Sequence, residues 1–138
     1  MGTPATLIVT GFDAQHFDLA QDFADSFRQA YQEQYQLAAV VFGPQAPPPQ
    51  LSDRFDRITR LDASGPSFDA GRNGYFLAHA GVNARLRDIF PGYASYCWVD
   101  ADCWFQGDES LPRILAGMPG FDLCIHPEFD VHYLNFPT

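Results

Sequence analysis

The chain has 138 residues, which is the size of a single domain that can bury a core. Its 17 acidic and 8 basic residues give a formal net charge of -9, and it contains no lysine, so the charge balance opposes binding to nucleic acid. A hydrophobic content of 46% excludes disorder. No apolar run reaches the roughly 18 residues of a membrane span, and the N-terminus lacks the pattern of a signal peptide. We therefore expect a soluble, cytoplasmic protein, whose oligomeric state the sequence does not indicate.

The first 42 residues have the pattern of a strand, a helix and a second strand. The apolar run Thr6–Thr10 predicts a short buried strand that stops at Gly11-Phe12-Asp13. Apolar residues then recur at steps of three and four, which is typical of an amphipathic helix: Phe17, Ala20, Phe23, Ala24, Phe27, Ala30 and Tyr31. Leu37–Phe42 predicts the second strand. Together, the two strands and the helix are expected to form a βαβ unit, whose crossover connection is right-handed.

The middle of the chain begins with a proline-rich stretch, Gly43–Gln50, which cannot continue a strand because proline lacks the backbone donor. We expect it to be a long connection inside one fold rather than a domain linker. Arg57–Asp62 alternates polar and apolar residues and predicts a third, less buried strand. An apolar stripe from Asn73 to Phe90 predicts a helix that covers the sheet and ends at Pro91-Gly92; it consists of Phe76, Leu77, Ala80, Ala84, Leu86 and Phe90.

The last third contains a strand at Ser95–Val99, a short helix at Ser110–Ala116 and a final strand at Phe121–Ile125. The alternation of strands and helices predicts an α/β fold with a mainly parallel central sheet and helices on both faces. We expect one domain over residues 1–138.

Two carboxylates follow the strand that ends at Val99. The chain passes from this apolar run into Asp100-Ala101-Asp102. Open α/β sheets bind ligands at the carboxyl ends of their strands, and two carboxylates make a hard oxygen site suited to Mn²⁺ or Mg²⁺ carrying a diphosphate. The pair therefore points to metal-assisted phosphate-ester chemistry. Alternatively, it only stabilises the following turn, since aspartate favours turns.

Two other interpretations of the acidic pair fit the residues poorly. An EF-hand loop that began at Asp100 would need glycine at its sixth position and glutamate at its twelfth, where Phe105 and Leu111 stand. Haloacid-dehalogenase-like phosphatases also place Asp-x-Asp after a buried strand. Their motif usually lies in the first strand and needs a lysine downstream, and this chain has no lysine.

The region resembles the Asp-x-Asp signature of GT-A-type glycosyltransferases. The similarity covers a helix that ends in Leu86-Arg87-Asp88-Ile89-Phe90, the turn Pro91-Gly92-Tyr93, and the run from Ser95 to Trp104. In addition, Leu7–Asp13 is similar to the family's first strand and the loop that receives the nucleotide base. The resemblance implies a GT-A or Rossmann-like nucleotide-binding half that covers most of the chain.

By this resemblance, the protein is expected to be a metal-dependent glycosyltransferase, or its donor-binding half, that uses a nucleotide-diphosphate sugar and an unknown acceptor. Asp102 would bind Mn²⁺ or Mg²⁺ most directly, and Asp100 would contact the metal, the ribose or both. The metal would neutralise charge on the leaving diphosphate. A GT-A enzyme normally continues well past its Asp-x-Asp, so we expect a C-terminally truncated domain. The alternative is a non-catalytic α/β nucleotide-binding or interaction module derived from such an enzyme.

Further candidate residues lie at the starts of the two predicted helices. Thr10, Gly11 and Asp13 close the first strand, where glycine lets a base approach the backbone and the polar side chains can bind its edge. Alternatively they form an ordinary β-to-α turn, with Asp13 at the helix N-terminus. Arg72, which precedes Asn73, could bind a phosphate or a sugar hydroxyl. Alternatively, this segment is only the start of a helix, with Asn73 as its N-cap.

Aromatic and tail residues carry weaker signals. We interpret Trp98 as a core residue; Trp104 is more simply a packing residue than a stacking platform for a sugar or base. A half-exposed strand explains the spacing of His126, Glu128, Asp130 and His132 as well as a metal site does. Three cysteines without CxxC spacing predict reduced, mostly buried thiols: Cys97, Cys103 and Cys124.

Overall fold

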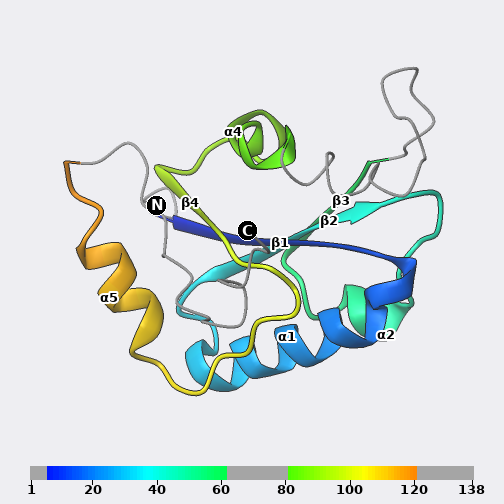
Figure 1. Cartoon of the computed structure of the whole chain (residues 1–138), viewed down its shortest axis with the longest axis horizontal. Coiled ribbons are helices and arrows are strands. Elements are labelled where there is room, and N and C mark those ends of the chain that lie inside the picture. Colours follow the sequence, from blue (N-terminus) through cyan, green and yellow to red (C-terminus); the bar gives the residue numbers. More distant parts are fainter. Residues whose placement is uncertain (1–5, 62–80, 121–138) are drawn as a thin grey trace, which may run out of the picture. The chain divides into compact units, whose positions relative to one another are not determined.

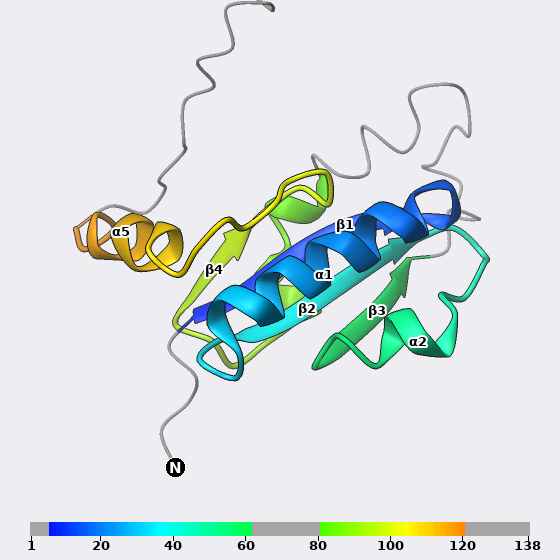
Figure 2. The ribbon, with the colours of Figure 1, turned by 90° about the horizontal axis from the view of Figure 1, so that it is seen from below.

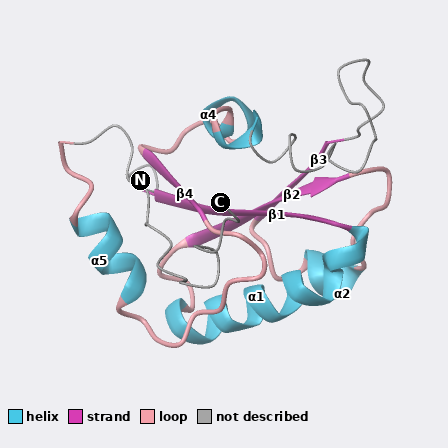
Figure 3. Ribbon diagram, in the orientation of Figure 1, coloured by secondary structure: helices cyan, strands magenta, loops and turns pink. Residues whose placement is uncertain are grey.

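The computed structural model describes residues 6–61 and 81–120. These residues contain four strands that form one sheet, in which every neighbouring pair is parallel. The strands are β1 (Thr6–Asp13), β2 (Gln36–Phe42), β3 (Arg57–Leu61) and β4 (Ser95–Trp98), and their order in the sheet is β3-β2-β1-β4. Helices lie on both faces of the sheet (Figures 1 and 3). The predicted α/β fold class is therefore confirmed.

One face of the sheet is covered by helix α1 (Phe17–Tyr31), which follows a short 3-10 helix, η1 (Ala14–His16). Figure 2 shows α1 running across β1 and β2. The apolar stripe predicted from the sequence is the buried side of α1, with Phe23 and Phe27 no more than 1% exposed. The helix ends at Tyr31, because the next residue, Gln32, has a φ of 51° outside the helical region, and its N–H donates to the carbonyl of Arg28.

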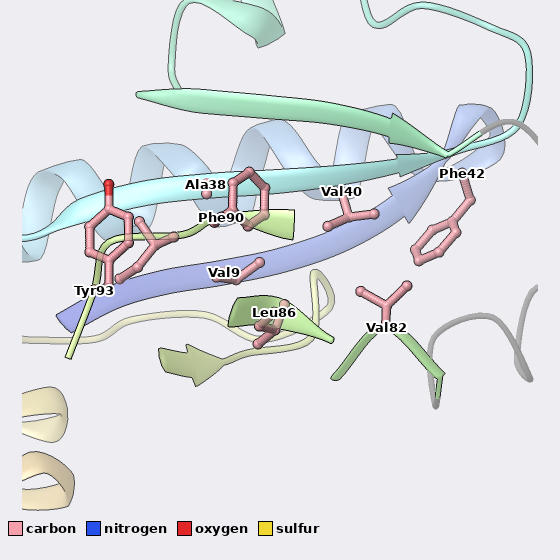
Figure 4. Close-up of a cluster of buried hydrophobic side chains, with 9 residues drawn as sticks. Val9, Ala38, Val40, Phe42, Val82, Leu86, Phe90 and Tyr93 are labelled. Atoms are coloured by element: carbon pink, nitrogen blue, oxygen red, sulfur yellow. The ribbon is translucent and has the colours of Figure 1, made fainter. Parts of the chain in front are cut away.

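The opposite face packs against helix α4 (Leu86–Ile89) and the residues around it. Figure 4 shows side chains of β1 and β2 meeting side chains from the segment between residues 82 and 93. Successive strand residues point to opposite faces, so Leu7 and Val9 of β1 belong to this cluster while Ile8 faces α1. The buried members of the cluster are Leu7, Val9, Ala38, Val40, Phe42, Val82, Leu86, Phe90 and Tyr93. Burial on both faces explains why β1 and β2 are almost continuously apolar.

The predicted helix from Asn73 to Phe90 is broken in its described part. Residues 81–83 are helical, residues 84 and 85 form a turn, and α4 then begins at Leu86. Arg85 has φ -117° and ψ 12°, and its N–H donates to the carbonyl of Val82, three residues back. Glycine and asparagine near this point, Gly81 and Asn83, are weak helix formers. The break leaves Ala84 exposed, contrary to the prediction, whereas Leu86 and Phe90 are buried as expected.

Other predicted elements agree closely with the structure. The proline-rich stretch is a connection that ends at α2 (Pro49–Ser52), with a proline at the first helical position. Strand β3 is an edge strand of the described sheet and is only partly buried, as its alternating pattern predicted. The strand predicted at Phe121–Ile125 lies outside the described residues.

The chain divides into two compact units, Met1–Gln106 and Gly107–Thr138. In the second unit, the described helix is α5 (Ser110–Ala116), as predicted from the sequence. An ion pair between Arg113 and Glu109, at 2.8 Å, joins its first turn to the residue before it. In the part of the chain that the structure describes, no helix is long and apolar enough to cross a membrane.

Candidate functional site

Strand β4 runs beside the first half of β1, so its carboxyl end lies next to the middle of β1. Val9 is paired with Trp98, and the N–H of Val99 donates to the carbonyl of Val9 at 2.9 Å. The chain proceeds from β1 to β2 and β3 on one side, whereas β4 joins β1 on the other side. The strand order therefore reverses between β1 and β4. Open α/β sheets bind ligands outside the carboxyl ends of the strands at such a point.

The acidic pair follows β4 at this edge of the sheet. The N–H of Cys103 donates to the carbonyl of Asp100 at 3.0 Å, which closes a turn around Ala101 and Asp102. Ala101 is buried, while Asp100 and Asp102 are exposed. The turn thus directs a small apolar side chain inward and leaves both carboxylates open to solvent. We call residues 100–103 the acidic turn.

The carboxylate of Asp100 is held by the indole of Trp98. The Nε1–H of Trp98 donates to Oδ1 of Asp100 at 2.8 Å. Residues two apart on an extended chain lie on the same side, so this bond follows from the geometry at the end of β4. No comparable bond from a described residue reaches the carboxylate of Asp102. One carboxylate of the pair is therefore oriented, and the other is free to turn toward a ligand.

Two carboxylates without further protein ligands suit a magnesium or manganese ion that carries a diphosphate. Mg²⁺ is usually bound by one or two carboxylates together with waters and substrate phosphates, rather than by a cage of protein atoms. Within residues 6–61 and 81–120, no three His, Cys, Asp or Glu side chains come together as a fuller metal site. The exposed oxygens of Asp100 and Asp102 fit the first kind of site.

Gly11 lies next to the indole of Trp98 rather than next to open space. A Cβ built on Gly11 would lie 2.6 Å from Cη2 of Trp98 and 2.9 Å from Cε2 of Phe42. The glycine thus allows the indole to pack against the backbone of β1. The residue before it, Thr10, is fully buried, and its hydroxyl has no hydrogen-bond partner among the described residues. The structure places neither residue where a base could reach it directly.

Asp13 caps the turn that leads from β1 into η1. Its Oδ1 accepts a hydrogen bond from the N–H of Gln15 at 3.0 Å and lies 2.5 Å from Nδ1 of His16. This is the β-to-α turn that the sequence offered as one alternative. No sequence pattern pointed to His16, apart from its spacing of three residues from Asp13. Asp13 is the last residue of β1 and lies four residues beyond Val9, where the pairing of β1 with β4 ends.

The thiol of Cys103 lies in the field of both carboxylates of the acidic turn. Partial burial raises the pKa of Cys103 above its usual value, and the charges of Asp102 and Asp100 raise the pKa further. Cys103 is exposed, whereas Cys97 is partly buried. The prediction that the cysteines are mostly buried is therefore wrong for Cys103, because the acidic turn leaves its surface open.

Trp104 is 76% exposed, so the prediction that it packs into the core is wrong. The next residue, Phe105, takes the packing position instead. Its ring lies 5.6 Å from that of Phe23, 5.5 Å from that of Phe27 and 5.4 Å from that of Tyr31, centroid to centroid. Because Phe105 faces α1, the indole of the neighbouring Trp104 points away from α1 and into solvent.

Several candidate residues lie outside the described part of the chain. Arg72 and Asn73, proposed as phosphate-binding and capping residues, belong to this group. So do Cys124 and the four polar residues of the tail, His126, Glu128, Asp130 and His132. The described site therefore consists of the acidic turn, Trp98 and the end of β1.

No protein-family model matches the chain, and no curated protein matches its sequence at a significant level.

Proposed function

We propose that the acidic turn binds a nucleotide-diphosphate sugar through Mn²⁺ or Mg²⁺, and that the protein is a metal-dependent glycosyltransferase or its donor-binding half. The observation that carries this proposal is the position of Asp100 and Asp102. They follow β4 at its carboxyl end, beside β1, where the strand order β3-β2-β1-β4 reverses. Parallel sheets with this order bind nucleotides at this point.

The charges support a site that needs a metal ion. The chain carries a formal net charge of -9, and both carboxylates of the acidic turn are exposed. A diphosphate that approached these carboxylates directly would meet like charge, which costs free energy at short range. A divalent cation between them turns this repulsion into attraction. When bound, the metal would supply Lewis-acid stabilisation of the charge on the leaving diphosphate.

The two aspartates have different roles in this proposal. Asp102 makes no hydrogen bond to a described side chain or backbone group, so both its oxygens are available to the metal. Asp100 shares one oxygen with the indole N–H of Trp98 and offers the other. The residues that would bind the sugar and the acceptor are not identified among those that the structure describes.

The end of β1 favours a second candidate, a module that binds the diphosphate and metal without reading the base. The hydroxyl of Thr10 is buried, Gly11 is covered by Trp98, and Asp13 is engaged by Gln15 and His16. Thr10 and Gly11 are therefore not accessible to a base, and Oδ1 of Asp13 is already used within the β-to-α turn. In this second candidate, inorganic pyrophosphate with Mn²⁺ binds about as well as a nucleoside diphosphate does.

Calorimetric titration of the purified chain separates these candidates. The ligands are UDP, GDP and inorganic pyrophosphate, each with Mn²⁺ and again with EDTA. A glycosyltransferase donor site predicts that one nucleotide binds more tightly than pyrophosphate, and only with Mn²⁺. Equal affinity for all three favours the second candidate. Binding that is the same with Mn²⁺ and with EDTA would contradict both.

A further inference from the structure

Trp98, the last residue of β4, contacts both Gly11 of β1 and the acidic turn. Its indole packs on the backbone of Gly11, where a Cβ would lie 2.6 Å from Cη2 and 3.0 Å from Cζ2 of the ring. The same Cβ would lie 2.9 Å from Cε2 of Phe42, so the space beside Gly11 is filled by the rings of Trp98 and Phe42. A larger residue at position 11 would displace the indole.

The polar edge of the same indole is directed at the acidic turn. Tryptophan has a single donor, Nε1–H, and no acceptor. That donor reaches Oδ1 of Asp100 at 2.8 Å, although the carboxylate is exposed and could be solvated by water. The bond therefore fixes which way the Asp100 carboxylate faces, and Oδ2 remains without a described donor.

We propose that Trp98 is a positioning residue for the metal site, and that Gly11 is what allows it to act. The indole, seated on Gly11, holds Oδ1 of Asp100 and presents Oδ2 to a divalent cation. This inference rests on the proposed function, because it concerns the metal that the acidic turn would bind. Groups that orient a metal ligand typically change metal affinity by about 10- to 100-fold when they are lost.

A substitution that keeps an aromatic ring at position 98 but removes the N–H donor distinguishes the positioning role of Trp98 from its packing role. Trp98→Phe keeps an aromatic ring on β4 and removes the N–H. Tyr96→Phe is the matched control, because Tyr96 is also on β4 and also loses one donor, its hydroxyl bond to the carbonyl of Phe90 at 2.7 Å. Both variants are expected to lose some stability. Only the first is expected to lose metal affinity.

The measurement is the affinity for Mn²⁺ alone, from the signal of the free ion in electron paramagnetic resonance. The expected result is a dissociation constant about tenfold or more higher for Trp98→Phe than for the wild type. Tyr96→Phe should match the wild type. Circular dichroism and thermal unfolding of both variants show whether each is folded at the temperature of the titration.

The hydrogen bond itself can be observed without any metal. In Trp104→Phe, Trp98 is the only tryptophan, so the single indole N–H signal in a ¹H–¹⁵N spectrum belongs to it. Adding Asp100→Ala to this background should move that signal upfield, and adding Gly11→Ala should move it as well. Adding Glu33→Ala, in the turn between α1 and β2, should leave the indole signal in place.

The outcomes distinguish this inference from the proposed function. Equal Mn²⁺ affinity of folded Trp98→Phe and the wild type overturns the positioning role and leaves the proposed function intact. An indole signal that does not respond to Asp100→Ala also overturns it. A wild-type chain that binds no Mn²⁺ overturns the proposed function, and this inference with it.

Discussion

The backbone N–H of Phe105 donates to the hydroxyl of Ser26 at 3.2 Å, and that hydroxyl donates to the carbonyl of Phe23 at 2.8 Å. Ser26 is a buried polar residue of α1, only 4% exposed, and these two bonds satisfy it. The acidic turn is thus fixed at two places. Trp98 holds it at the end of β4, and Phe105 fixes the chain on α1 five residues after Asp100.

We predict that Phe105→Ala destabilises the chain by about 2 to 3 kcal/mol. A fully buried phenylalanine costs about 3 to 5 kcal/mol on truncation, and Phe105 is partly buried against three rings. Urea unfolding followed by circular dichroism measures the loss. The matched control is Trp104→Ala, which removes a larger ring that is 76% exposed and should change stability by less than about 0.5 kcal/mol. A larger loss for the control than for Phe105→Ala would contradict this packing.

Gly11→Ala should destabilise the chain by about 1 to 3 kcal/mol, because the added methyl group overlaps the rings of Trp98 and Phe42. Thermal or urea unfolding measures the change. Gly81→Ala is the control, since a Cβ at this helical residue meets nothing within 4 Å. It should be neutral or stabilising by up to about 1 kcal/mol.

A double variant checks the cause of the Gly11→Ala effect. The nearest atom, Cη2 of Trp98 at 2.6 Å, and Cζ2 of Trp98 at 3.0 Å belong to the six-membered ring of the indole, which extends further from the backbone than the ring of phenylalanine. The cost of Gly11→Ala should therefore be smaller in the Trp98→Phe background than in the wild type. An unchanged cost would show that Trp98 is not the group that the methyl meets.

Alkylation of Cys103 should be slow in the metal-free protein at mildly alkaline pH. Its pKa is raised by partial burial and by the charges of Asp102 and Asp100. A raised pKa means less thiolate at a given pH, and the thiolate is the reactive form. The rate of reaction with iodoacetamide, followed by peptide mass spectrometry, should have its pH midpoint above the value of about 8.5 for a free cysteine.

Asp102→Asn should lower that midpoint because it removes one of the charges that raise the pKa of Cys103. Glu33→Gln, which removes a charge in the turn between α1 and β2, should leave the pH midpoint unchanged. A Cys103 midpoint at or below that of a free cysteine would be inconsistent with the described surroundings of the thiol.

Much of the fold could be predicted from the sequence because parallel strands buried on both faces are continuous apolar runs. Thr6–Thr10 and Leu37–Phe42 are such runs, and each covers most of a strand. Ser95–Val99 also contains a strand, β4, although its residues are only partly buried. Strand β1 nevertheless continues to Asp13, since Gly11 and Phe12 still pair with Val40 and Val41. Glycine indicated the end of a strand, but its lack of a side chain serves the packing of Trp98.

The parts that could not be predicted depend on contacts between distant residues or on local backbone breaks. The spacing of Leu86 and Phe90 predicts that both side chains are buried, as they are. The same spacing does not indicate whether the helix is interrupted, as it is by the turn at residues 84 and 85. The choice between Trp104 and Phe105 as the packing ring depends on the position of α1. The Trp98–Asp100 bond, in contrast, has a local signal, which is the spacing of two residues at the end of a strand.

The metal-dependent nucleotide site is tested by comparing the wild type with Asp102→Ala in calorimetric titrations of UDP and GDP in the presence of Mn²⁺. Removing one hard-oxygen ligand from a site with two carboxylates should abolish measurable nucleotide binding. Glu33→Ala is the control, because it removes the same charge at an exposed position in the turn between α1 and β2. We expect nucleotide binding by the wild type and by this control, and none by Asp102→Ala. Equal affinity of the wild type and Asp102→Ala for the nucleotide that the wild type binds would contradict it.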